Sequence, residues 1–375
     1  MPRLGPVEYA IPFFILAIVA EMIWAKRRRP DSYEPRDTLT SLALGTGSSV
    51  AGGLTAALVV GAMVCLYDHR IATIGWAWWA WAACFVLDDF NYYWAHRTGH
   101  RVRWFWASHV NHHSSQHYNL STALRQTWTG FFALSFIFRI WPAFIGFNPA
   151  MLLTCGAINL VYQFWIHTEA IRRMPRWFEA AMNTPSHHRV HHATNPQYLD
   201  RNYAGVFIVW DKLFGSFAAE RDDTRIHYGI VKQLGSFSLI WSVFHEWIGI
   251  ARDLWSAPWR HKFAYLWREP GWSHDDSRES SAKIRARWEA LQPFQTIQWS
   301  NLRRFNRAVK RSGARSGSNG RVRHNRNRWW QRRKRRCRAA GRKWTPPRLP
   351  ARSWRDQRYR AGKNPGFHAV HSESF

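Results

Sequence analysis

Long apolar segments alternate with short polar ones through the first half of the chain. There are five, at 7–25, 41–67, 72–94, 128–147 and 150–170. Each is long enough for a helix to cross about 30 Å of hydrocarbon. Because lipid offers no partners for free backbone groups, such segments are expected to be helical. The pattern predicts an all-α fold, an integral membrane helical bundle with about four to five spans.

Charges beside these segments predict their orientation. Lys26–Arg29 follow the first segment directly, and basic residues near a span favour the cytoplasmic side. Tracing the spans from there brings every histidine cluster to one face, the cytoplasmic one. Residues 171–270 then form a histidine-rich helical cap. Its amphipathic stretch 237–254 either belongs to this cap or lies in the membrane interface.

The last part of the chain has a different composition. The net charge is +29, of which +22 belongs to residues 301–375. We therefore divide the chain into N-terminal membrane helices (1–70), a catalytic domain (71–275) and a basic, disordered tail (276–375). This tail binds nucleic acid or anionic headgroups, has no role, or is out-of-frame sequence. We expect no nucleic-acid partner.

Cysteine usage excludes two kinds of site. Cys65, Cys84, Cys155 and Cys337 are widely spaced, without a C-x-x-C pair. A disulfide framework or a zinc–thiolate site is therefore not expected. Free cysteines, mostly buried in apolar segments, are the expectation.

Histidines carry the strongest functional signal. Three boxes have metal-ligand spacing: His96 and His100; His109, His112 and His113; His188, His191 and His192. Helical residues three or four apart lie on neighbouring positions of one face, so each box directs its imidazoles to one region. Eight imidazoles are too many for one ion and suit two. Imidazole suits iron, zinc, copper and nickel alike, so these eight are predicted catalytic metal ligands of unspecified metal.

Other polar residues near the boxes have two interpretations each. His167 is either a ligand or an interface residue, and His187 either binds metal or only flanks its box. Asp88, Asp89, Asp200 and Asn202 either hydrogen-bond the far nitrogen of a ligand imidazole or are solvated at helix ends. Surface or capping roles are expected for the remaining candidates, His117, His227, His245, His261 and His274.

Two stretches carry a family resemblance. Residues 88–126, DDFNYYWAHRTGHRVRWFWASHVNHHSSQHYNLSTALRQ, and residues 167–217 resemble the fatty acid hydroxylase / sterol desaturase superfamily of membrane di-iron enzymes. The resemblance covers about residues 5–275. The segment 227–258, followed by Pro270-Gly271-Trp272, looks most like the bacterial relatives of alkylglycerol monooxygenase.

This resemblance implies an O2-dependent oxidoreductase with two iron ions held by the eight histidines. It implies hydroxylation or desaturation of a membrane lipid chain, of an ether-lipid or sterol-like kind, in a bacterial inner membrane. A separate electron donor is implied: cytochrome b5, a ferredoxin or tetrahydrobiopterin. Two other hypotheses remain, a non-catalytic metal-binding membrane protein and a nucleic-acid-binding protein led by the tail.

Overall fold

The computed structural model describes residues 5–291, whose regular elements are helices joined by turns and loops, with two isolated β-bridges. An all-α fold is thus confirmed for these residues. Of the tail predicted to be disordered (276–375), residues 281–291 are helical, and the part after residue 291 lies outside the described residues. The main helices are α1 (Pro6–Arg28), α2 (Pro35–Asp68), α3 (Trp78–Arg101), α4 (Arg103–His113), α7 (Pro149–Trp165), α9 (Pro185–His191), α11 (Leu239–Ser256) and α12 (Trp259–Trp267). Shorter elements are η1 (Pro30–Ser32), η2 (Leu120–Leu124), α5 (Ile137–Ile140), α6 (Pro142–Ile145), α8 (Arg176–Ala181) and α10 (Val209–Leu213).

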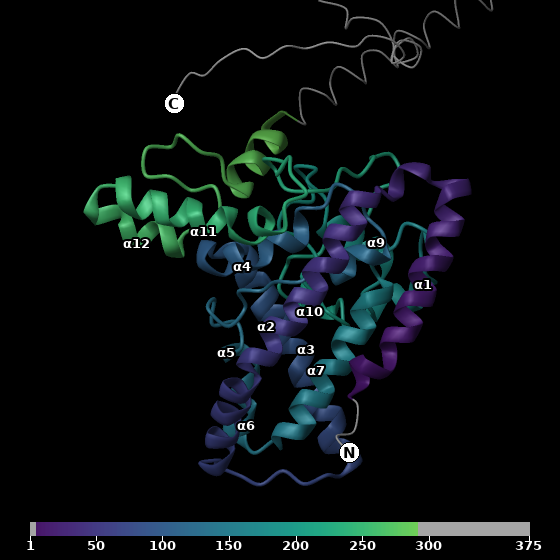
Figure 1. Cartoon of the computed structure of the whole chain (residues 1–375), viewed down its shortest axis with the longest axis vertical. Helices are drawn as coiled ribbons and strands as arrows, with labels where there is room; N and C mark the ends of the chain where they lie inside the picture. The colour runs from purple at the N-terminus through teal and green to yellow at the C-terminus, as the bar shows by residue number, and fades with distance from the viewer. Residues whose placement is uncertain (1–4, 292–375) are drawn as a thin grey trace, which may run out of the picture. The chain divides into compact units, whose positions relative to one another are not determined.

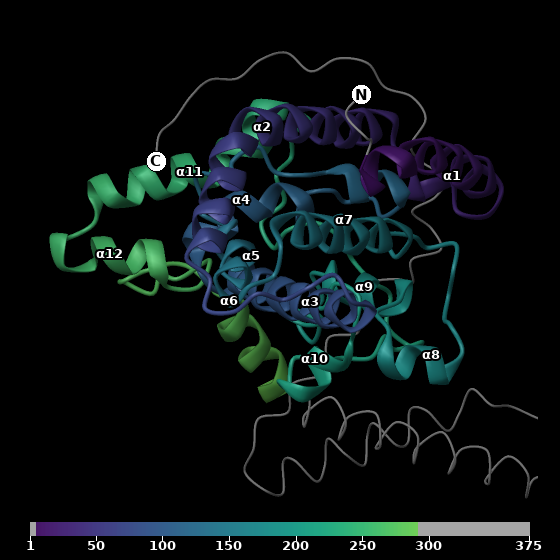
Figure 2. The same ribbon diagram turned by 90° about the horizontal axis from the view of Figure 1, so that it is seen from below.

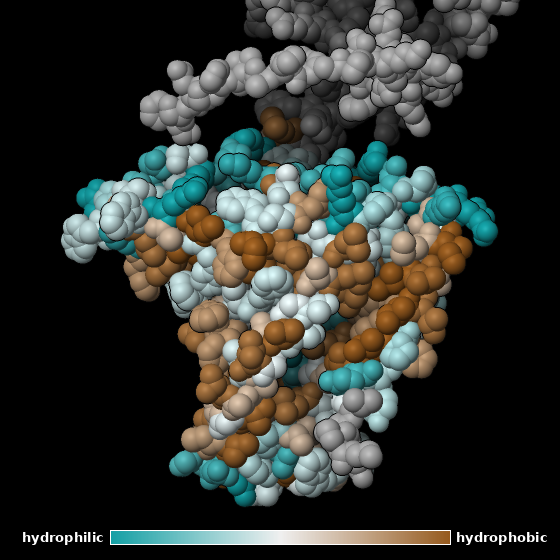
Figure 3. Space-filling model, viewed as in Figure 1, coloured by the Kyte–Doolittle hydropathy of each residue, from teal (hydrophilic) through white to brown (hydrophobic). Residues whose placement is uncertain are grey.

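Four long helices form the bundle (Figure 1). Figure 2 shows α7 between α2 and α3, with α1 to one side. Within the described residues, α1 and α2 are the two helices long and apolar enough to cross a membrane. Their apolar side chains are largely exposed, and the lower part of the molecule is predominantly brown in Figure 3.

Local sequence explains where two of these helices begin. The Glu34 carboxylate accepts a hydrogen bond of 2.6 Å from the Asp37 N–H, with Pro35 at the first helical position of α2. Asn148 caps α7 in the same way, with Pro149 next. Both arrangements satisfy a free N–H at the helix start and use a proline where no N–H is needed.

The apolar segment 128–147, predicted as a span, is not a continuous helix. It contains turns followed by α5 and α6, which have four residues each. Leu134 has a φ of 59°, which no α-helix accommodates. Pro142, which lacks an N–H, limits α5 to one turn. Hydropathy alone overestimated the number of spans at this point.

Helix α2 packs closely against the segment after the second histidine box through two of its glycines, Gly45 and Gly47. A Cβ at Gly45 would lie 2.6 Å from the Leu124 carbonyl oxygen, and one at Gly47 would clash with the Trp128 ring. Nothing lies within 4 Å of such an atom at Gly52 or Gly53. These contacts hold the segment after the second histidine box against α2.

Helices α11 and α12 form a hairpin beside α4. Arg103, at the first position of α4, donates hydrogen bonds of 2.6 Å to both Glu246 and Asp253 of α11. The Arg103 side chain is only 5% exposed, so the pairing is shielded from water and salt. The second histidine box is thereby fixed to this hairpin.

Candidate metal centre

Three separate segments bring the histidine boxes to one place. His96 and His100 lie at the end of α3, and the second box ends α4. The third box occupies α9, with His192 at its C-cap. Close ring contacts join all three boxes, such as 4.4 Å between the centroids of His96 and His191.

The imidazoles divide into two neighbouring groups. One group contains five residues, His96, His100, His109, His113 and His191. The other contains four, His112, His167, His188 and His192. Within each group the candidate ligand atoms all lie within 4.8 Å of one another, a separation that a single ion can bridge. His167 joins the eight histidines of the boxes in this arrangement.

Helical spacing explains how a box serves both groups. Residues i and i+4 are nearly eclipsed along a helix, whereas i+3 lies about 100° from i+4 around the axis. His109 and His113 accordingly share one group, and His188 and His192 share the other. His112 and His191, each three positions after the first histidine of its box, belong to the group opposite to that of the other two.

Backbone carbonyls orient several of these rings. The Nδ1 atoms of His96, His112, His167 and His191 lie 2.8–3.1 Å from the carbonyl oxygens of Tyr203, Arg125, Gln163 and Arg201, respectively. A carbonyl oxygen only accepts, so each Nδ1 carries its hydrogen and donates it. In a neutral ring, Nε2 then presents a lone pair to the interior of the group.

These lone pairs face each other. The Nε2 atoms of His112 and His167 lie 3.3 Å apart, although both rings donate their hydrogen from Nδ1. Among the described residues, the buried Nε2 atoms of His100 and His191 have no hydrogen-bond partner. Buried polar atoms without partners are costly. A cation between the rings would satisfy these atoms, so the residues present fit a metal in each group.

Burial keeps the imidazoles neutral. Desolvation lowers the pKa of His112 to about 4. It also lowers the pKa values of His109, His113, His188, His191 and His192 well below the ordinary value, and the neighbouring imidazoles lower them further. Neutral imidazole is the form that binds metal. These histidines therefore do not need to lose a proton at neutral pH before they bind an ion.

The carboxylates near the boxes, for which an imidazole contact and solvation at a helix end were both open, have different positions, and Asp88 and Asp89 are buried. Asp89 accepts hydrogen bonds from the N–H groups of Val206 and Phe207, and Asp88 accepts one from Asn159. Neither bonds a histidine ring among the described residues. Asp200 does face one, with its Oδ1 3.9 Å from Nδ1 of His100.

The remaining polar candidates support the backbone or lie elsewhere. Asn202, with a φ of 58°, donates to the carbonyl oxygen of His187 and accepts from the Ala218 N–H. The His187 ring packs edge-on against Phe217, 5.4 Å between centroids, and belongs to neither group. The histidines for which surface or capping roles were expected also lie outside both groups, namely His117, His227, His245, His261 and His274. Cys65, Cys84 and Cys155 are free, as predicted, though Cys65 is exposed.

One positioning residue was missed in the sequence. Asp211 is fully buried and accepts 2.8 Å hydrogen bonds from the N–H groups of Tyr203 and Ala204. It therefore holds the backbone whose Tyr203 carbonyl orients His96. Its position 19 residues after the third box gives no sign of this contact.

We expect the Asp211→Ala protein to bind metal about 10–100-fold more weakly, because it loses the support of a ligand-orienting carbonyl. Equilibrium dialysis of the purified full chain against Fe(II) measures this. Asp275→Ala removes an exposed carboxylate and serves as the control. Unchanged affinity in a folded Asp211→Ala protein would refute the positioning role.

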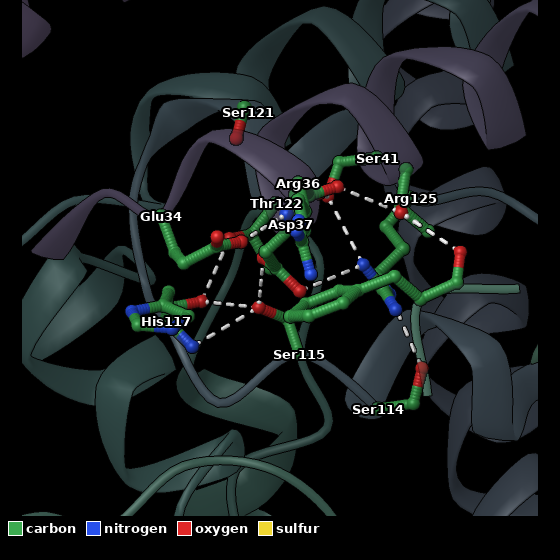
Figure 4. Close-up of polar contacts among 12 residues, drawn as sticks. Glu34, Arg36, Asp37, Ser41, Ser114, Ser115, His117, Ser121, Thr122 and Arg125 are labelled. Atoms are coloured by element: carbon green, nitrogen blue, oxygen red, sulfur yellow. Dashed lines mark hydrogen bonds and ion pairs between the residues drawn. The ribbon is translucent and has the colours of Figure 1, made fainter. Parts of the chain in front are cut away.

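A second carbonyl is held by a buried ionic network (Figure 4). Arg125, whose carbonyl accepts from His112, donates through its guanidinium to Asp37 at 3.1 Å, Ser41 at 3.3 Å and Ser114 at 3.1 Å. Ser115 donates to the same Asp37 carboxylate at 2.6 Å. The start of α2 is thus tied to the turn that follows the second box.

An apolar cavity of about 780 Å³ ends at both histidine groups. Side chains of α1 and α2 such as Ile11, Phe14 and Leu42 line one part of it. His96, His109, His112 and His167 line another. A long apolar molecule could therefore lie along the helices with one of its carbons beside the imidazoles.

Comparison with known proteins agrees with this site. Residues 81–216 match the model of the fatty acid hydroxylase family. The chain is 36% identical over 278 residues to alkylglycerol monooxygenase of Homo sapiens and 38% identical over 276 residues to that of Danio rerio. Each alignment covers 71% of this chain and 60% of the relative. A cholesterol 25-hydroxylase-like protein of Danio rerio is 30% identical over 154 residues, covering 38% of this chain and 57% of its own.

No solved structure matches the chain. The chain spans about 60% of the length of the alkylglycerol monooxygenases. The matched region 81–216 contains all nine histidines of the two groups together with Asp211. Residues 81–216 thus form a fatty acid hydroxylase domain by similarity, and the chain is similar to alkylglycerol monooxygenases over 71% of its length.

Proposed function

We propose that the chain is a membrane-bound, metal-dependent monooxygenase that hydroxylates a lipid chain. One observation carries this proposal: lone pairs of buried imidazoles converge, without protons between them, at the end of an apolar cavity. The names of the relatives, alkylglycerol monooxygenase and cholesterol 25-hydroxylase-like protein, agree with it. An ether lipid is the first candidate substrate.

Two iron ions are the proposed cofactor. A structural zinc site has four ligands and a catalytic one three with an open position, whereas nine imidazoles in two adjoining groups provide for two ions. Bound iron would supply the activation of O2. The protein would hold the ions, orient the substrate and exclude competing reactions.

The residues of the cavity have a separate task. The apolar wall formed by α1, α2 and α7 desolvates an alkyl chain and limits where its carbons lie. Small differences in that position would select the carbon that reacts and decide between hydroxylation and desaturation. Water has few polar partners at this wall, which protects a reactive site from side reactions.

A membrane position follows from the exposed apolar surface. Helices α1 and α2 would cross the bilayer, with the basic last turn of α1, Lys26–Arg28, on the cytoplasmic side. Trp259, Phe263 and Trp267 lie four residues apart along α12 and are 59–85% exposed. In Figure 3 the lower side of the α11–α12 hairpin is brown and its outer side teal. Such a hairpin suits the membrane interface, with the histidine groups just beneath the bilayer.

Reconstitution tests the proposal directly. We expect the purified full chain to bind about two irons and, with O2 and a reductant, to convert 1-O-alkylglycerol to a hydroxylated product. Mass spectrometry with ¹⁸O2 would show one labelled oxygen in that product. Protein that takes up zinc only, or iron without any O2-dependent lipid oxidation, would instead be a metal carrier.

A matched pair of α7 variants tests the role of the cavity. Leu160 lines the cavity and is 42% exposed, whereas Leu153 does not line it and is 47% exposed. Leu160→Trp would shorten the accessible cavity and lower turnover of long-chain substrates by at least about tenfold. A single methylene that fits or does not fit an apolar pocket already changes kcat/KM by about this factor. Leu153→Trp should retain the wild-type chain-length profile. Equal profiles in both variants would exclude this cavity as the substrate site.

A further inference from the structure

A second cavity, of about 670 Å³, is lined by Tyr118, whose ring contacts His167 and His192 of the four-histidine group. We define it as the polar cavity; its wall comes from the end of α1 and from segments near residues 30–32, 116–118, 169–172 and 220–233. Six arginines line it, Arg28, Arg29, Arg172, Arg189, Arg221 and Arg225, against the four carboxylates Asp31, Glu169, Glu220 and Asp222. It is thus a mildly basic, hydrogen-bonding space, unlike the apolar cavity.

Some of these charges are already paired, and others are free to meet a ligand. Arg189 is bound to Glu220 at 2.7 Å and to the carbonyl oxygens of Thr168 and Ile171. Within residues 5–291, the exposed side chains of Arg28, Arg29 and Arg225 make no ion pair. Their positive charge would attract an anionic or acceptor-rich molecule.

Two stacked tyrosines connect the polar cavity with the imidazoles. The rings of Tyr118 and Tyr228 both line it and stack with 4.8 Å between centroids and 10° between planes. The buried Tyr118 ring then lies 5.2 Å from His192 and 5.9 Å from His167. Tyr228 is half-buried, so the stack leads from solvent to the four-histidine group.

We propose that electrons enter the metal centre through the polar cavity, by way of Tyr228 and Tyr118. This inference rests on the proposed function, because the net reaction RH + O2 + DH2 → ROH + H2O + D oxidises a donor DH2 by two electrons. The donor also supplies two protons, and these leave with one oxygen atom as water. In the proposed function the lipid occupies the apolar cavity, so a polar donor would bind in the polar cavity instead.

The dimensions of the polar cavity favour one class of donor. Small-molecule sites usually measure about 300–1,000 Å³, and this cavity lies within that range. A reduced heteroaromatic carrier with carbonyl or phosphate acceptors fits the space and its charge. The tyrosine rings stay chemically unchanged, because electrons pass across them without oxidising or reducing them. Electronic coupling between aromatic rings in contact is stronger than coupling across an empty gap.

Anaerobic stopped-flow reduction of the iron-loaded full chain in nanodiscs tests the route, with dithionite and reduced methyl viologen as probes. Tyr228→Leu removes the outer ring and should slow iron reduction several-fold with both probes. Tyr228→Phe keeps the stack and should reduce at the wild-type rate. Equal rates for wild type and Tyr228→Leu would overturn the proposal.

Hydrogen peroxide separates electron entry from site structure, because RH + H2O2 → ROH + H2O needs no donor. Peroxide-driven hydroxylation should therefore be unchanged in Tyr228→Leu, at unchanged iron content. A parallel loss of peroxide-driven turnover would overturn the proposal by giving Tyr228 a structural role. If even the wild type showed no iron reduction and no lipid product, the proposed function itself would fail.

Charge at the mouth of the polar cavity provides an independent measurement. Arg29→Gln with Arg225→Gln should slow reduction by anionic dithionite and accelerate reduction by cationic methyl viologen, and added salt should diminish both effects. Arg252→Gln, at an exposed position of α11, is the control and should change neither rate. An effect of the same size in the control would contradict entry at this cavity.

Discussion

We expect the His188→Ala protein to lose metal and activity together. His188 belongs to the four-histidine group, and its Nε2 lies 3.0 Å from that of His167 and 3.2 Å from that of His192. Removing a residue that only supports a ligand already lowers metal affinity or activity about 10–100-fold. Loss of a ligand itself should therefore reduce turnover by more than about 100-fold. Metal analysis should show about one iron per chain where the wild type holds about two.

The neighbouring residue provides the control. His187→Ala removes an imidazole that belongs to neither group, and the backbone carbonyl that accepts from Asn202 remains. The lost contact with Phe217 should lower thermal stability without lowering iron content. If both variants lost iron equally, or if His188→Ala kept full activity at full loading, the assignment of ligands would be wrong.

The histidine boxes show what spacing can and cannot predict. Their i, i+3 and i+4 pattern predicts imidazoles that meet, and the three boxes do lie together. The spacing separates the i+3 imidazole from the other two of its box, but it does not predict which group each imidazole joins, since this depends on how α4 and α9 are rotated against each other. The inclusion of His167 was left open for the same reason.

The backbone groups that hydrogen-bond the histidines and Asp89 could not be predicted from the sequence. The carbonyl groups that orient His96 and His112 belong to Tyr203 and Arg125, whose side-chain identities do not determine where their carbonyls point. Likewise Asp89, for which an imidazole contact and solvation at a helix end were both open, is buried and binds the backbone N–H groups of Val206 and Phe207, more than 100 positions away. Long-range contacts of this kind follow from packing and not from local pattern.

Hydropathy succeeded where a segment was uniformly apolar and unbroken. It located α1 and α2 to within a few residues at most ends. It failed over 128–147, since a window average does not register a single proline or one residue with positive φ. The segment contributes Phe136 and Phe138 to the apolar cavity.

The network between α2 and the second box predicts the largest loss of stability. Arg125 and Asp37 have side chains only 1% and 4% exposed, and removing one partner of a buried ion pair costs about 3–5 kcal/mol because the other charge remains uncompensated. Asp37→Asn should therefore destabilise the full chain by about this amount. Thermal unfolding in detergent measures the change, and iron content should fall with it because the Arg125 carbonyl orients His112.

Replacing both partners distinguishes an unpaired charge from a lost contact. A double variant, Asp37→Leu with Arg125→Met, contains no buried charge and should recover part of the stability that Asp37→Asn loses, because apolar replacement of both partners is often close to neutral. Asp223→Asn breaks an exposed pair with Arg221 and should leave unfolding unchanged. A double variant less stable than Asp37→Asn would mean that the hydrogen bonds of Arg125 to Asn111 and Ser114, and not its charge, hold this turn in place.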